Sequence, residues 1–141
     1  MKLENDLEIF NSIFSSKNPR SSNCFHPLWL LADNSVAKYY VYVIDLDEKV
    51  ANHKRFRSKN PKYIKGNGCV YVGQSSKIPE IRFEQHKEGY KSNFYAKLYG
   101  MRLLPHFYEK YNPIPTRKDA ENIEAMIGKA LRLKHIGVWF N

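Results

Sequence analysis

This chain of 141 residues has few cysteines and no long apolar run. Its two cysteines, Cys24 and Cys69, are too few and too far apart in sequence to indicate a disulfide framework or a zinc site. We expect Cys69, which falls in a strand-like pattern, to be a small buried hydrophobic residue. The longest apolar stretch, residues 24–32, is interrupted by His26 and Pro27 and is shorter than the ~20 residues of a membrane-spanning helix.

A targeting signal is also missing from the N-terminus of the sequence. The first ten residues, MKLENDLEIF, carry acidic side chains where a secretory signal has a basic start and an apolar centre. Together with the lack of a long apolar run, this predicts a cytoplasmic protein with no membrane partner.

The sequence also has fewer acidic than basic residues. It contains 14 Asp and Glu and 23 Lys and Arg, which gives a formal net charge of +9. Such a charge favours anionic partners, of which nucleic acid is the most common. The hydrophobic content of 43% and the charged content of 26% are typical of a soluble globular protein. The length suits one compact domain that can bury a core without metals or disulfides.

The positive charge is concentrated in residues 49–65, which we name the basic segment. It contains no acidic residue, and the rings of His53, Phe56 and Tyr63 are interleaved with its cations. One interpretation is a nucleic-acid-binding arm whose cations follow the phosphates while its rings stack on bases. The alternative is a solvated loop that only keeps the protein soluble. The seven cations are Lys49, Lys54, Arg55, Arg57, Lys59, Lys62 and Lys65.

Hydrophobic patterning divides the chain into an N-terminal helical extension, residues 1–37, and a core domain, residues 38–141. An amphipathic helix is predicted over residues 3–14. Two buried strands are predicted at 39–46 and 68–73, and the basic segment joins them as antiparallel neighbours. The second is expected to end at Gly73, whose missing Cβ allows a sharp turn.

Three helices and a third strand are predicted beyond these strands. Pro79 suits the first turn of one helix and Gly89 its end, with Arg82 and His86 one turn apart on the same face. A short helix is predicted over 94–99 and an irregular strand over 101–111, where Pro105 marks an edge or a break.

The last helix is predicted to begin after Thr116, with Asp119 in a capping-box-like position. Its apolar stripe runs from Ala120 to Leu131, and Glu124 lies at the border of that stripe. Gly128, one turn later, is expected to leave open space beside the carboxylate. The fold class predicted from all elements is α/β of the α+β type, a small three-stranded antiparallel sheet flanked by helices.

From residue 38 onward the chain resembles the GIY-YIG nuclease superfamily. The two tyrosine signatures of that family resemble YVYVI at 40–44 and YVG at 71–73, and the order and spacing of the later motifs match too. The sequence departs from the family where Tyr40 replaces a usual glycine, where valines replace isoleucines, and in the long connection between the strands. The matching site residues are Tyr42, Tyr71, Arg82, His86, Glu124 and, as the last residue of the sequence, Asn141.

The resemblance implies a DNA endonuclease in which Tyr71 activates a water molecule and Tyr42 orients it or shares its proton. A single Mg²⁺ or Mn²⁺ would be held by Glu124, and Arg82 would bind the charged phosphate. His86 would relay a proton or hold a phosphate. Each of these residues also has an interpretation that does not depend on the resemblance. The tyrosines would then be packing residues, Arg82 and Glu124 would be partners in ordinary ion pairs, and His86 would be a structural residue.

Two other functions stay open from the sequence. One is a nucleic-acid-binding module that keeps this fold without turnover, and the other is a protein-interaction domain whose charge serves only solubility. RNA also remains open as a substrate beside duplex or branched DNA, because the choice depends on groove shape and sugar contacts.

Overall fold

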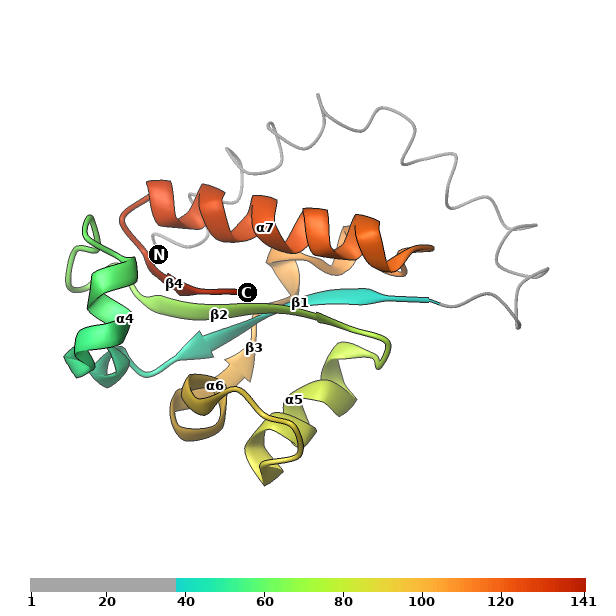
Figure 1. The fold of residues 1–141 in the computed structure, drawn as a ribbon, viewed down its shortest axis with the longest axis horizontal. Coiled ribbons are helices and arrows are strands. Elements are labelled where there is room, and N and C mark those ends of the chain that lie inside the picture. The colour runs from blue at the N-terminus through green and yellow to red at the C-terminus, as the bar shows by residue number, and fades with distance from the viewer. Residues whose placement is uncertain (1–37) are drawn as a thin grey trace.

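The computed structural model describes residues 38–141, so the helix predicted at 3–14, the rest of the N-terminal extension and Cys24 lie outside the described residues. The described chain is an α+β arrangement built on one mixed sheet of four strands in the order β3-β1-β2-β4 (Figure 1). The strands are β1 Tyr40–Leu46, β2 Cys69–Ser75, β3 Gly100–Leu103 and β4 Gly137–Trp139.

The two central strands agree with their prediction. Strands β1 and β2 pair antiparallel over their full length, and residues 41–46 and 69–73 are buried. Continuous burial of this kind is typical of strands covered on both faces. Cys69 is a fully buried free thiol, as predicted. Strand β2 does not stop at Gly73 but continues to Ser75.

The edges of the sheet correct the three-stranded antiparallel prediction. Strand β3 covers only four residues and is followed by 3₁₀ helices at Pro105–Phe107 and Glu109–Tyr111, because a proline cannot donate to a strand ladder. Strand β4 was not predicted, and it pairs with β2 in parallel. The sheet is therefore mixed and has one strand more than expected.

The helices cover both faces of this sheet. Helix α7, Arg117–Leu133, lies along one face, whereas α5, Pro79–Glu88, and α6, Phe94–Tyr99, lie on the other (Figure 1). Gly89 ends α5 with a left-handed φ of 95°, and Thr116 Oγ1 accepts the Asp119 N–H at 3.1 Å. No helix in residues 38–141 is long and apolar enough to cross a membrane.

The basic segment is a folded part of the domain and not an extended arm. It forms a 3₁₀ helix with its neighbours, Glu48–Asn52, and then helix α4, Lys54–Lys59. Phe56 is fully buried and so cannot stack on a base, whereas Tyr63 is partly buried and donates to a Glu48 carboxylate oxygen. All seven cations are nevertheless exposed.

Two contacts connect α4 and α7 to the last strand. The Asn60 side chain accepts the Val138 N–H at 2.8 Å and donates to the Phe56 carbonyl at 2.9 Å. On α7, a Cβ at Gly128 would meet the Phe140 ring at 2.3 Å. The open space expected beside Gly128 is therefore filled by an aromatic ring.

We predict that Gly128→Ala destabilises the fold by about 1–3 kcal/mol, because the added methyl group overpacks against Phe140. In an unconstrained helix the same change stabilises by up to ~1 kcal/mol. Urea unfolding measures the difference. In a Phe140→Ala background the substitution should become neutral or stabilising, and equal destabilisation in both backgrounds would contradict this packing.

Candidate active site

Two tyrosines of the central strands lie against each other on one face of the sheet. The register places Tyr42 opposite Gly73 and Tyr71 opposite Ile44, and directly opposed residues point to the same face. The two phenol rings have centroids 6.2 Å apart. Both side chains are almost closed to solvent, with exposed fractions of 1% for Tyr42 and 4% for Tyr71.

Gly73 is the reason that the Tyr42 ring can lie flat across the neighbouring strand. A Cβ at this position would stand 2.5 Å from the Tyr42 hydroxyl oxygen. The glycine was expected to make a sharp turn, but it lies inside β2 and its φ is not positive. Its function in the site is to leave room for a phenol ring.

The imidazole of His86 fixes Tyr42 from the α5 side. His86 Nε2 lies 2.9 Å from the Tyr42 hydroxyl, and His86 Nδ1 accepts the backbone N–H of Asn93 at 3.1 Å. Because Nδ1 is an acceptor, the ring proton of neutral His86 is on Nε2 and points to the Tyr42 oxygen. Burial, and then the charge of Arg82, lower the pKa of His86 to about 4.

The hydrogen-bond chain continues from Tyr42 to Tyr71. Burial raises the pKa of both phenols, and their mutual hydrogen bond raises the pKa of Tyr42 while it lowers that of Tyr71. Because the Tyr42 oxygen accepts the Nε2 proton of His86, its own hydroxyl proton is left to donate to Tyr71. The side chain of Asn141 is a second hydrogen-bond partner that lowers the pKa of Tyr71.

Arg82 supplies the positive charge of this site. Its guanidinium donates to the carbonyls of Tyr90 at 3.1 Å and Lys91 at 2.7 Å, and to Gln85 Oε1 at 3.3 Å. The interpretation of Arg82 as an ordinary surface ion pair therefore does not describe what it contacts. Its charge lowers the pKa of Tyr42 and of Tyr71, although burial outweighs it at both.

Glu124 brings a carboxylate to the same place from α7. Its side chain is 4% exposed, and this burial raises the pKa of Glu124 to about 7. A hydrogen bond from the Asn141 backbone lowers that pKa, but burial has the larger effect. The negative charge of Glu124 in turn raises the pKa of Tyr71. Strand β4 ends at Trp139, beside Tyr71, and Asn141 follows two residues later, next to both groups.

The carboxylate of Glu124 fits a divalent cation better than an ordinary ion pair. Its Oε2 atom is buried and has no hydrogen-bond partner among residues 38–141. Within that same range no three His, Cys, Asp or Glu side chains gather as a ligand set. Glu124 would therefore be the single carboxylate ligand that the described residues offer to a cation, and a hard ion such as Mg²⁺ can be held by one or two carboxylates with water and phosphate oxygens.

The structure thus brings together the six predicted site residues, and it keeps most of the basic segment elsewhere. Arg55 is the member that reaches this region, with its guanidinium 6.0 Å from the Trp139 ring, one strand from Tyr71. Arg57 instead donates to the carbonyls of Ala51 and Asn52 and supports the local fold. The six residues are Tyr42, Tyr71, Arg82, His86, Glu124 and Asn141.

One functional contact was missed by the sequence analysis, namely the backbone N–H of Asn93 on His86. Asn93 caps α6, and its Oδ1 accepts the N–H groups of Tyr95 and Ala96. An Asn before a predicted helix is a readable cap signal. The sequence could have located the cap, but not the imidazole that its N–H meets.

Comparisons of the chain with protein-family models, with curated proteins and with solved structures found no match. Any assignment of function consequently depends on the geometry of these residues and on their order in the sequence.

We predict that His86 stays neutral at pH 6, because its pKa is lowered to about 4 from an ordinary value of about 6.5. The stabilising contribution of the neutral ring is complete above pH ~6.5 and is lost as the pH falls toward 4. Long-range ¹H–¹⁵N NMR should show the Nε2–H tautomer at pH 6. A His86 signal that titrates near pH 6.5 would contradict this geometry.

We predict that Glu124→Gln stabilises the protein at pH 8 by up to about 3 kcal/mol when divalent cations are chelated. The raised pKa of about 7 means that stability is highest while Glu124 is protonated and is lost as the pH rises through 4.5 to 7. Urea unfolding at pH 5 and pH 8 tests this, and the gap should nearly close at pH 5. The exposed Glu84→Gln on α5 is the matched control, and a Glu124→Gln protein less stable than wild type at pH 8 would contradict the prediction.

Proposed function

We propose that this protein is a divalent-metal-dependent endonuclease that hydrolyses DNA phosphodiester bonds with a single metal ion. The observation that carries the proposal is the convergence of six dispersed polar residues, contributed by β1, β2, α5, α7 and the final residue. A directional hydrogen-bond chain runs from His86 through Tyr42 to Tyr71, and Tyr71 adjoins the buried carboxylate of Glu124. The same residues carry the resemblance to GIY-YIG nucleases.

Tyr71 is the proposed group that takes the proton of the attacking water. Its hydroxyl accepts from Tyr42 and is also a partner of Asn141, and both contacts favour the phenolate. Tyr42 is held in place by His86, which is buried and neutral and so acts as a positioning residue. The earlier interpretation of His86 as a phosphate contact does not suit a ring that is closed to solvent.

Glu124 is the residue that would hold the metal, because its Oε2 faces no partner in the described part of the chain. A bound Mg²⁺ or Mn²⁺ would supply Lewis acidity toward a phosphate oxygen. Arg82 would add charge stabilisation at the phosphate. Its guanidinium has five N–H donors, of which three contact residues 38–141 as given above, so that two have no partner in that range and could donate to phosphate oxygens.

One observation favours a second function, a nucleic-acid-binding module without turnover. Burial raises the pKa of both phenols, and the charge of Glu124 raises that of Tyr71 further. Neither tyrosine is ionised at neutral pH unless a cation offsets that carboxylate. A protein of this fold that never recruits a cation would bind its substrate and leave it intact.

We predict Mg²⁺- or Mn²⁺-dependent nicking of supercoiled plasmid by the wild-type protein. Glu124→Ala and Tyr71→Phe should abolish it, and Arg82→Ala should reduce it by about 10³-fold or more, because each removes a group at the reacting phosphate. Glu84→Ala, which removes an exposed carboxylate on α5, should leave the rate unchanged.

Three controls complete the nicking experiment. Chelation should stop the reaction and added metal should restore it. Binding of plasmid without cleavage at any metal concentration would favour the non-catalytic module, and cleavage that persists in all three site variants would refute the site. An equivalent RNA substrate separates DNA from RNA specificity.

A further inference from the structure

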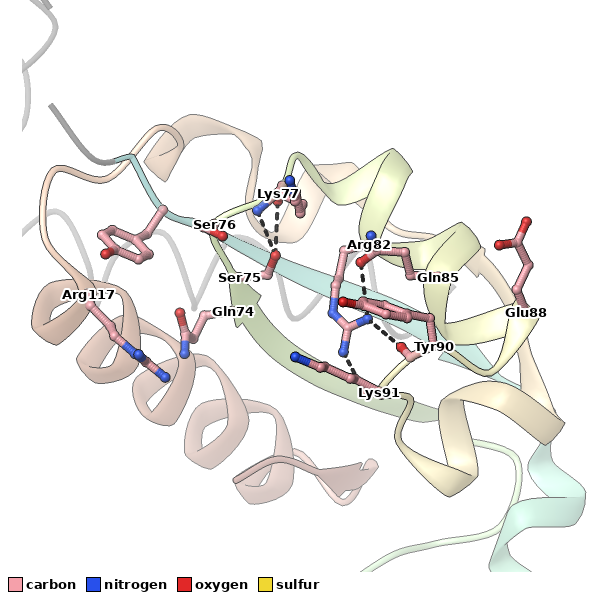
Figure 2. Close-up of a pocket in the computed structure, with 11 residues that line it drawn as sticks. Gln74, Ser75, Ser76, Lys77, Arg82, Gln85, Glu88, Tyr90, Lys91 and Arg117 are labelled. Carbon is pink, nitrogen blue, oxygen red and sulfur yellow. Dashed lines mark hydrogen bonds between the residues drawn. The ribbon is translucent and has the colours of Figure 1, made fainter. Parts of the chain in front are cut away.

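A cavity of about 620 Å³ opens beside the candidate site, between α5 and the N-terminal end of α7 (Figure 2). Its size falls within the ~300–1,000 Å³ of typical small-ligand pockets. The end of β2 separates its two sides, with Arg117 of α7 across from Arg82 and Lys91 (Figure 2). Its lining residues are Tyr39, Gln74, Ser75, Ser76, Lys77, Arg82, Gln85, Glu88, Tyr90, Lys91 and Arg117.

The charge of this lining selects an anion. Four cations, Lys77, Arg82, Lys91 and Arg117, share the lining with one carboxylate, that of Glu88, and Arg117 is also ion-paired with Glu121, 3.4 Å away on the next turn of α7. Glu88 lies on the far side of α5 from Arg117 (Figure 2), so the space between the helices is predominantly positive. Serine hydroxyls and glutamine amides among the other lining groups can donate to phosphate or base oxygens.

The cavity and the candidate site share Arg82, and the segment that holds Arg82 is a wall of the cavity. The carbonyls of Tyr90 and Lys91 accept from its guanidinium, while the side chains of these two residues line the cavity. Lys91 has a left-handed φ of 44°, which costs energy for a residue other than glycine. An occupant that contacts Tyr90 or Lys91 therefore also acts on the orientation of Arg82.

Tyr90 offers an aromatic surface at this position. Its side chain is 56% exposed, although the large ring of a tyrosine usually packs against other apolar side chains. The Lys91 ammonium lies 5.6 Å from the centroid of the Tyr90 ring. An aromatic ring beside cations is the combination that binds single-stranded nucleic acid, in which bases stack and phosphates pair with charges. A base inside a duplex is already stacked on its neighbours and would have to leave them to reach Tyr90.

We propose that this cavity is a subsite for one unpaired nucleotide next to the cleaved bond. Lys91 and Arg117 contact its phosphate and Tyr90 stacks on its base. The inference builds on the proposed nuclease function and specifies its substrate as DNA with a single-stranded segment, such as a flap or a branch. Recognition here involves no base-edge contact, so the subsite selects strand structure and not sequence.

The test measures binding and not cleavage, in a Glu124→Gln background, with a fluorescent oligothymidine and a duplex of equal length. Tyr90→Ala should weaken oligothymidine binding about 5- to 150-fold and change duplex binding little, because stacking on one base is lost. The Lys91→Gln/Arg117→Gln double variant should lower the slope of log K against log salt by about 0.7 on the single strand, because one phosphate loses its cations.

Matched controls come from the same chain. Phe94→Ala removes an aromatic ring with a similar exposed fraction, 54%, outside the cavity lining. Lys129→Gln/Lys134→Gln removes the same charge from the other end of α7. Both controls should leave the affinity for oligothymidine within about twofold, and circular dichroism melting confirms that every variant is folded.

The outcomes separate the subsite from the nuclease proposal. Equal effects of Tyr90→Ala on single strand and duplex, or a salt slope that matches the lysine control, would overturn the subsite. Thymidine monophosphate that binds as tightly as the oligonucleotide would also overturn it, since a strand would then add nothing. If the predicted losses appear but the wild-type protein never nicks plasmid, the subsite stands and the nuclease proposal fails.

Discussion

The hydrogen bond from the Asn93 backbone to His86 Nδ1 sets the direction of the hydrogen bonds that link His86, Tyr42 and Tyr71. It leaves the imidazole proton on Nε2, which makes Tyr42 an acceptor from His86 and therefore a donor to Tyr71. Tyr71 becomes the end of the chain, where proton loss is most favoured. A backbone group thus decides which of two similar tyrosines donates and which accepts, and no side chain substitution at Asn93 removes that N–H except proline.

Geometry supplies the second constraint, because the site lies where two layers of the fold meet. The absence of a Cβ at Gly73 allows the Tyr42 ring to lie across β2. Strand β4 stops at Trp139, and the chain beyond it brings Asn141 beside both Tyr71 and Glu124 of α7.

The sequence predicted the parts of this fold that depend on local rules. The paired central strands, the proline and glycine at the ends of α5, and the cap at Thr116 all follow from residue type and spacing. Strand β4 and the packing of Phe56 could not be found in this way. A strand of three residues has too little periodicity to register, and Phe56 is buried by contacts with distant elements such as Trp139. Motif order located the site residues, whereas their tautomers and pKa values depend on burial, which only the fold determines.

Burial shifts the pKa values of two titratable groups of the site in opposite directions, and in both cases it favours the uncharged form. It lowers the pKa of His86 and raises that of Glu124, so each favours its uncharged form. Arg82 is then the permanent charge, and it is only partly buried, on the side that opens to the cavity. Ionised Glu124 restores a negative charge that a cation can meet, and it does so only above its raised pKa of about 7. A cation held by Glu124, as proposed, would bind more tightly as the pH rises through this range, because the proton and the cation would compete for the same buried oxygen atoms.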